Sequence, residues 1–153
     1  MDIKYYVPTV KDIPMMQNLV KEEVESGVIL HRSNDEMATT IRSYICVLVD
    51  DVLAGFVALH IHSMDLAEVR SLIVSEKFRG LSLGKGLVQY CLKEAKRLNV
   101  DTVLSLTYKK EFFEKLNFHE IDKESLPEHK IWADCIKCKH FPVCNEIALV
   151  ISI

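Results

Sequence analysis

The sequence predicts an α/β domain in which helices cover a mixed β-sheet. Two observations lead to this class. Three strand-like segments follow one another over residues 45–74, with a tight turn at Asp50 and Asp51 between the first two. The third segment continues through a glycine-bearing loop into a helix-like segment. Hairpins pair strands antiparallel and crossover helices pair them in parallel, so one sheet is expected to contain both kinds of pairing.

Length and composition fit a single domain over residues 1–153, because a chain of this size can bury one core. The net charge is -3 and no basic stripe is present, so nucleic acid and anionic membranes are not expected partners. The apolar runs fall short of the ~20 residues of a membrane span. The first residues also lack signal-peptide character, and we expect a cytoplasmic protein.

The N-terminal third is predicted to form a short strand and two helices. The strand covers residues 4–7. Apolar residues then recur every three or four positions over residues 13–24, which indicates an amphipathic helix that Gly27 ends. Ser33 and Glu36 form a capping-box pattern that opens the second helix. The apolar face of this helix is expected to carry Met37, Ile41 and Ile45.

The remaining elements follow from the same periodicities. Strands are expected over residues 45–49, 52–61, 67–74, 102–107, 118–121 and 146–153, and helices over 84–98 and 109–116. Gly55 is predicted to mark a bulge or a close approach of two backbones, and Asn99 to end its helix. Residues 122–144 are expected to form a long loop. The predicted order is therefore β-α-α-β-β-β-α-β-α-β-β, with an apolar last strand that could pair at a sheet edge in a homodimer.

Strand, glycine loop and helix together favour an anion site near residue 80. The loop carries Gly80, Gly84 and Gly86, together with Arg79 and Lys85. Glycines let the backbone approach a ligand closely, and the start of a helix offers N–H groups and a partial positive charge. The spacing fits neither a Walker loop nor the dinucleotide fingerprint. Taken alone, the loop is equally compatible with an ordinary glycine turn.

The loop and the element order resemble those of the GNAT family of N-acetyltransferases. The acetyl-CoA loop of that family has the pattern Arg/Gln-x-x-Gly-x-Gly/Ala, which Arg79 and Gly84 match, with Ser82 in place of the first glycine. The resemblance implies the mixed-sheet fold of the family and acetyl-CoA as cosubstrate. The residues that it places at the cofactor are Leu72, Ile73, Val74, Arg79, Gly80, Ser82, Leu83, Gly84 and Lys85.

Further segments resemble the acetyltransferase domain of N-acetylglutamate synthases, and this likeness covers nearly the whole chain. They lie at residues 27–33, 67–72, 112–118 and 124–130, and residues 131–138 resemble the end of the short, single-domain type. The resemblance implies acetyl transfer to the α-amine of glutamate, the first step of arginine biosynthesis, without the arginine-sensing kinase domain of the longer type. Alternative acceptors are glutamine, another small amine or a protein N-terminus. A different alternative is an acyl-CoA-binding module without catalysis.

An amine must be neutral to attack a thioester, so this chemistry needs a base. Glu68 is the candidate, because it lies on the central strand where the acetyl group would arrive. In a regular strand Glu68, Arg70, Leu72 and Val74 would point to one side. The alternative for Glu68 is a surface carboxylate paired with Arg70.

The general acid is less evident. Many relatives use the tyrosine of a Tyr-x-x-x-Gly-Phe pattern, but Phe113 and Asn117 stand at the tyrosine and glycine positions here, as the resemblance to the synthases implies. Tyr108 follows a predicted strand and could donate the proton instead. It could equally be a packed aromatic residue with a solvated hydroxyl.

Glutamate carries two carboxylates, so its site is expected to hold at least two cations. Arginine suits bidentate recognition of such groups. The candidates are Arg32, Arg70 and Lys130, of which Arg32 directly precedes a helix cap. Arg32 could also be a solvated loop charge, and Arg70 could orient Glu68 instead of binding a substrate carboxylate.

The five cysteines fall into two groups. Cys46 and Cys91 lie in apolar segments and are expected in the core. The other group is Cys135, Cys138, His140 and Cys144. These residue types can bind a structural zinc ion, but the spacing is tight and a second paired motif is missing. Reduced thiols or a redox-labile pair are therefore favoured, and no metal is expected.

Overall fold

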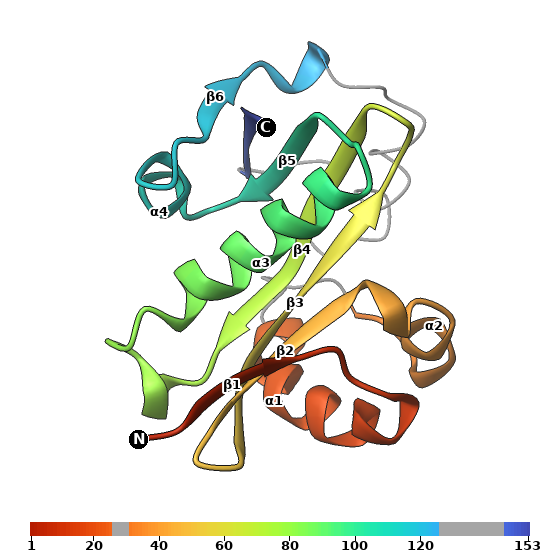
Figure 1. Ribbon diagram of the computed structural model, residues 1–153, viewed down its shortest axis with the longest axis vertical. Coiled ribbons are helices and arrows are strands. Elements are labelled where there is room, and N and C mark those ends of the chain that lie inside the picture. The colour runs from red at the N-terminus through yellow and green to blue at the C-terminus, as the bar shows by residue number, and fades with distance from the viewer. Residues whose placement is uncertain (26–30, 126–145) are drawn as a thin grey trace.

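The computed structural model describes residues 1–25, 31–125 and 146–153. Its element order confirms the predicted one (Figure 1). The elements are β1 (Ile3–Tyr6), α1 (Ile13–Glu25), α2 (Asn34–Thr39), β2 (Tyr44–Val49), β3 (Val52–Ile61), β4 (Leu66–Val74), α3 (Leu83–Arg97), β5 (Thr102–Thr107), α4 (Lys110–Glu114), β6 (His119–Ile121) and β7 (Ile147–Ser152). The expected end of the first helix at Gly27 lies outside the described residues. No helix in the described ranges is both long enough and apolar enough to cross a membrane.

The strands in the described ranges belong to one seven-stranded sheet in the order β1-β2-β3-β4-β5-β7-β6. In this sheet β4 and β5 pair in parallel, whereas the other described pairs are antiparallel. Asp50 and Asp51 join β2 to β3 with φ angles of 48° and 66°. Two successive positive φ values are typical of the type I′ turn, which matches the twist of the strands that it joins. The mixed sheet and the tight hairpin are thus as predicted.

The position of the last strand was predicted wrongly. β7 lies between β5 and β6 and pairs with both, so it is not an edge strand. Its central residues, Ala148, Leu149 and Val150, are buried. A continuous apolar run is typical of a strand with neighbours on both sides and cover on its faces. The apolar character of β7 therefore reflects burial within this chain and gives no argument for a dimer.

Helices lie on both faces of the sheet (Figure 1). On one face, Leu87 and Cys91 of α3 belong to a cluster that includes Val57 of β3. On the other face, Met16 of α1 belongs to a cluster with Cys46. Cys46 and Cys91 are both buried, as expected from the sequence. The sheet is therefore the central layer between two apolar clusters.

A β-bulge in β4 changes which side chains share a face. Arg70 pairs with Ala58 and Ile73 with Phe56, so two residues of β4 stand opposite one residue of β3. Ser71 adopts a φ of 55°, the left-handed conformation found in some bulges. Because of this extra residue, the alternation of side chains shifts after Arg70.

The expectation that Glu68, Arg70, Leu72 and Val74 share one side is therefore wrong. Leu72 and Val74 pack in the cluster of α3, whereas Ile73 packs in the cluster of α1. Glu68 and Arg70 come before the bulge and share the opposite side from α3. The bulge thus separates the polar part of β4 from the part that leads into the glycine loop.

The ends of the helices follow local signals in part. Asn99 has a φ of 63°, and the N–H of Val100 donates to the carbonyl of Ala95, which completes a Schellman cap at the end of α3 as predicted. The prediction for the second helix was partly wrong, because α2 ends at Thr39. Of its expected apolar face, Met37 lies in α2, Ile41 lies in a 3-10 turn and Ile45 lies in β2.

Candidate active site

The start of α3 leaves its first backbone N–H groups open to a ligand. Ser82 precedes the helix with φ 59° and ψ 29°, and within the described residues its side chain makes no capping hydrogen bond. An N-cap residue usually has an extended backbone and closes the helix end with its own oxygen, as Ser33 does at α2. The first N–H groups of α3, those of Leu83, Gly84 and Lys85, have no partner within the helix. Together they can bind an anion.

Two positive charges flank this helix start in the sequence, Arg79 in the loop before α3 and Lys85 in its first turn. Arg79 and Lys85 are exposed, as is Gly80, whereas Leu83 is buried in the core. Gly80 has a φ of 88° and nothing within 4 Å of the position of a Cβ atom. Its conformation, rather than lack of space, therefore explains the glycine.

Gly86 has a different reason. A Cβ atom built on Gly86 would lie 1.9 Å from the hydroxyl oxygen of Tyr5 in β1. The ring of Tyr5 stacks on that of Tyr90 in α3, with 4.7 Å between the ring centroids. Gly86 therefore lets β1 pack on α3, and this glycine of the predicted loop is explained without a ligand.

The parallel strands β4 and β5 are joined at one end only. Pairing covers residues 66–69 of β4 and 102–105 of β5, whereas β4 continues to Val74 and β5 to Thr107. Beyond Val69 and Ser105, the described parts of β4 and β5 are not paired with each other. In the described part of the chain, no strand pairs with residues 71–74 on the side that faces β5, and backbone groups at such an edge can pair with an added strand. This edge leads directly to the loop before α3.

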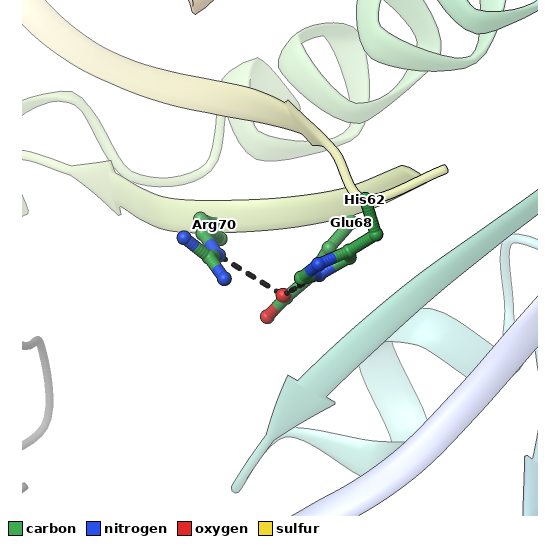
Figure 2. A network of polar contacts seen from close by, with 3 residues as sticks. All are labelled: His62, Glu68 and Arg70. Carbon is green, nitrogen blue, oxygen red and sulfur yellow. Dashed lines mark hydrogen bonds and ion pairs between the residues drawn. The ribbon is translucent and has the colours of Figure 1, made fainter. Parts of the chain in front are cut away.

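Glu68 is a buried carboxylate at the point where the two strands separate. Its residue is 6% exposed. Its Oε1 accepts a hydrogen bond of 2.9 Å from Nε of Arg70 and lies 2.8 Å from Nε2 of His62 (Figure 2). In the sheet, Glu68 stands between His60 of β3 and Leu104 of β5. The pair with Arg70 is thus present, but in the interior rather than at the surface.

The two oxygens of Glu68 differ in their surroundings. Oε1 meets both partners, and Figure 2 shows the second oxygen, Oε2, pointing away from His62 and Arg70. Among the described residues no hydrogen bond or ion pair reaches Oε2. No buried side-chain oxygen or nitrogen in the described ranges lacks a partner, so Oε2 is not sealed from solvent. A carboxylate held by one oxygen and open at the other is suited to accept a proton.

Arg32 and Arg70 act on the same buried group. Tyr44, at the start of β2, is 3% exposed. Burial raises the pKa of its phenol, and this is partly offset by the positive charges of Arg32 and Arg70 and by a hydrogen bond with Thr40. The backbone carbonyl of Arg32 also accepts a 2.7 Å hydrogen bond from Nε2 of Gln17 in α1. Two of the predicted substrate cations therefore converge near Tyr44.

The sequence reasoning missed His62 and Tyr44. His62 falls between the predicted strands 52–61 and 67–74, but its side chain is 2% exposed and contacts Glu68. The sequence did contain a signal for a histidine near Glu68. A hairpin of the strands 52–61 and 67–74 with its turn near residue 64 places His60 opposite Glu68. Tyr44 carried no comparable signal, because its neighbours Arg32 and Arg70 come from distant segments.

The remaining predicted acid, substrate and metal residues are exposed or lie outside the described residues. Tyr108 lies between β5 and α4 and is 42% exposed. Lys130 and the group Cys135, Cys138, His140 and Cys144 lie outside the described residues. In the described part of the chain, no group of three or more His, Cys, Asp or Glu residues could hold a metal ion.

A mixed sheet with a half-open parallel pair, next to an uncapped helix start, is the architecture of an α/β acyltransferase domain. The chain belongs to the acetyltransferase (GNAT) family, whose sequence pattern matches residues 13–119. An uncharacterised N-acetyltransferase of Chlorobaculum tepidum is 32% identical over 139 residues, which cover 91% of this chain and 89% of that protein. The chain is thus an N-acetyltransferase by family.

The amino-acid acetyltransferase of Pasteurella multocida is 27% identical over 124 residues, which cover 80% of this chain. The chain spans only 28% of that enzyme's length. The N-acetylglutamate synthase of Neisseria gonorrhoeae, in complex with coenzyme A and N-acetyl-glutamate, superposes with a TM-score of 0.88 at 22% identity. It is matched over 99% of this chain and 35% of its own.

A protein of Mycobacterium tuberculosis in complex with coenzyme A is also similar. Its TM-score is 0.83 at 19% identity, over 98% of this chain and 99% of its own. At such low identities the two solved structures establish the fold, which is the one that the sequence predicted.

Proposed function

We propose that this chain transfers the acetyl group of acetyl-CoA to the α-amine of a small amino acid, and that glutamate is the preferred acceptor. One observation carries the proposal. The open oxygen of a buried carboxylate, Oε2 of Glu68, lies where β4 and β5 separate, on the strand that leads to the uncapped start of α3. A base, an open strand edge and an anion site thus follow one another along one element.

Acetyl-CoA fits this order of features. Its pyrophosphate would bind the N–H groups at the start of α3, with Arg79 and Lys85 beside it. Its pantetheine arm carries amides, which can pair with the open edge of residues 70–74 as an added strand would. The thioester would then reach the point of separation near Glu68. The complexes of related proteins with coenzyme A support this placement.

The reaction can be written with this chain's residues. Oε2 of Glu68 accepts a proton from the α-ammonium group, and the nitrogen lone pair forms a C–N bond with the thioester carbon. The C–S bond breaks and its electron pair leaves on the sulfur of coenzyme A. The nitrogen loses its second proton, which the sulfur takes up, and Glu68 returns its proton to solvent. Tyr108 is the candidate that could pass the proton to sulfur, and Tyr108→Phe tests this role.

The acceptor is proposed from the cations on the Glu68 face. An α-amino acid carries a carboxylate next to its amine, and Arg70 places a guanidinium next to the base. Arg32, near the same buried Tyr44, offers a second cation for a side-chain carboxylate. Arg32→Gln should therefore raise KM for glutamate at least about tenfold and leave KM for acetyl-CoA unchanged. Equal changes in both KM values would argue against this role.

The experiment measures release of the coenzyme A thiol with each of the twenty amino acids in turn. Glutamate is expected to give the highest kcat/KM. A higher value with glutamine would retain the reaction and change the acceptor. Absence of a rate with every amino acid would overturn the proposal and leave another amine, a protein N-terminus or an acyl-CoA-binding module.

The base is tested by Glu68→Gln, with Glu111→Gln on the exposed face of α4 as a matched control. The Glu68 variant should lose at least about a hundredfold in kcat at neutral pH, and less at high pH, where the free amine is present without a base. The control should retain its rate. A loss in Glu68→Gln that does not change with pH would contradict the role as a base.

A further inference from the structure

His62 belongs to the site without a role in the reaction as written above. It lies just beyond the end of β3, and its backbone N–H donates to the carbonyl of Leu66 at 2.9 Å. Its side chain is 2% exposed, and its ring packs edge-on against that of His60 with 4.7 Å between centroids. Its Nε2 lies 2.8 Å from Oε1 of Glu68. A histidine this enclosed has a fixed orientation.

The contact defines which ring nitrogen carries a proton. Oε1 of an ionised Glu68 can only accept hydrogen bonds, and Arg70 can only donate them. A short contact between Nε2 and Oε1 therefore requires a proton on Nε2 of His62. Figure 2 shows Arg70 and His62 approaching the same oxygen, Oε1, from two different directions. With Arg70, His62 occupies Oε1 and leaves Oε2 as the oxygen that can accept a proton.

We propose that His62 is a positioning residue for the base, which acts by donating from Nε2 to Oε1 of Glu68. This inference rests on the proposed function, in which Oε2 accepts the amine proton. Two donors on one oxygen fix the rotation of the carboxylate about its last bond. A carboxylate with Arg70 as its single donor would turn more freely, and Oε2 would spend less time facing the amine.

Removal of the His62 hydrogen bond should also change how the reaction rate depends on pH. In the described residues, the ionisable groups that face Glu68 are His60 and His62 from the β3 side and Arg70 from β4, whereas β5 contributes Leu104. Hydrogen bonds to an ionised carboxylate favour its charged form. Loss of the His62 donor should therefore move the acid limb of the rate profile to higher pH.

The kinetic test compares His62→Leu with His62→Gln, on whichever amino acid the wild-type protein acetylates. Leucine removes the donor, whereas glutamine can place an amide nitrogen near the position of Nε2. His62→Leu should lower kcat at least about tenfold, leave KM for acetyl-CoA unchanged and shift the acid limb upward. His62→Gln should restore most of kcat and of the pH profile. His119→Leu, at an exposed histidine of β6, should behave like the wild-type protein.

Two results would overturn the inference. One is a His62→Gln variant as slow as His62→Leu, because a retained donor would then have no benefit. The other is a slow His62→Leu variant with an unmoved acid limb, which would indicate a structural role alone.

A second readout needs no turnover. Nitrogen-15 NMR of the histidine side chains should show a proton on Nε2 of His62, and Glu68→Gln should shift this nitrogen but not those of His119. A His62 ring protonated only at Nδ1 would overturn the inference. If the wild-type protein acetylates no amino acid, the proposed function fails, whereas the contact between His62 and Glu68 is still tested by this measurement.

Discussion

Gly55 of β3 lies directly against the carbonyl oxygen of Ile73 in β4. A Cβ atom built on Gly55 would lie 2.5 Å from that oxygen, closer than such atoms approach in real structures. The partner is backbone and cannot turn away. Gly55 pairs with Val74, the last residue of β4, and lies close to the bulge at Ser71. Gly55 thus sets how near β3 comes to the strand that carries the site.

Gly55→Ala should destabilise the protein, because the added methyl group must push the two strands apart. We expect a loss of about 1–3 kcal/mol in the free energy of unfolding, the range for overpacked interiors. Denaturation by urea would measure it. Gly80→Ala is a useful comparison, because it has space for a Cβ and suffers only from its φ of 88°. An alanine at residue 55 that costs nothing would contradict the packing described for β3 and β4.

Ser82→Gly should stabilise the protein. Ser82 has a φ of 59° and makes no capping hydrogen bond within the described residues, so glycine would relieve strain without loss of a contact. The left-handed conformation costs a residue with a Cβ roughly 1–2 kcal/mol, and the added freedom of glycine in the unfolded chain offsets part of this. A net gain of about 1 kcal/mol is expected from thermal or urea unfolding. Ser82→Ala should give no gain, and a gain equal to that of glycine would refute the strain.

Stability should fall between pH 9 and 12. Burial, followed by the charge of Glu94, raises the pKa of the Cys91 thiol from 9.0 to about 12. Burial, followed by the charge of Asp12, raises that of Cys46 to about 12. In the unfolded chain these thiols ionise near pH 9 and favour unfolding, whereas in the folded protein they stay protonated. Their stabilising effect is thus complete below pH 9 and is lost as the pH rises toward 12.

Tm measured from pH 8 to 11 checks this sign. Cys91→Ala removes one ionisable thiol, so its Tm should fall less steeply with pH than that of the wild-type protein. The fall is measured for each protein from its own Tm at pH 8. Parallel curves for the two proteins would contradict the assignment to Cys91.

Much of the fold was predictable because its signals are local. The turn at Asp50 and Asp51 and the cap at Asn99 each depend on residues within one turn of chain, and both are present. Gly55 indicated a bulge or a close approach, and the structure has both features there. The succession of strand, glycine loop and helix over β4 and α3 was also recognisable from the sequence.

The parts that failed depend on distant partners. Nothing in the sequence near Ser71 distinguishes a bulge from a regular strand, since the extra residue appears only when β4 is paired with Val57 and its neighbours in β3. The place of β7 depends on β6, which its own apolar residues do not indicate. The convergence of Arg32 and Arg70 on Tyr44 joins three separate segments, and only the folded chain brings them together.

The central claim is that the start of α3 binds the pyrophosphate of coenzyme A and thereby directs the thioester to Glu68. A crystal structure of the protein with coenzyme A tests this most directly. The account predicts phosphate oxygens within hydrogen-bond distance of the N–H groups of Leu83, Gly84 and Lys85, with the sulfur at the separation of β4 and β5. Coenzyme A bound elsewhere, or an empty helix start in a crystal saturated with it, would contradict the account.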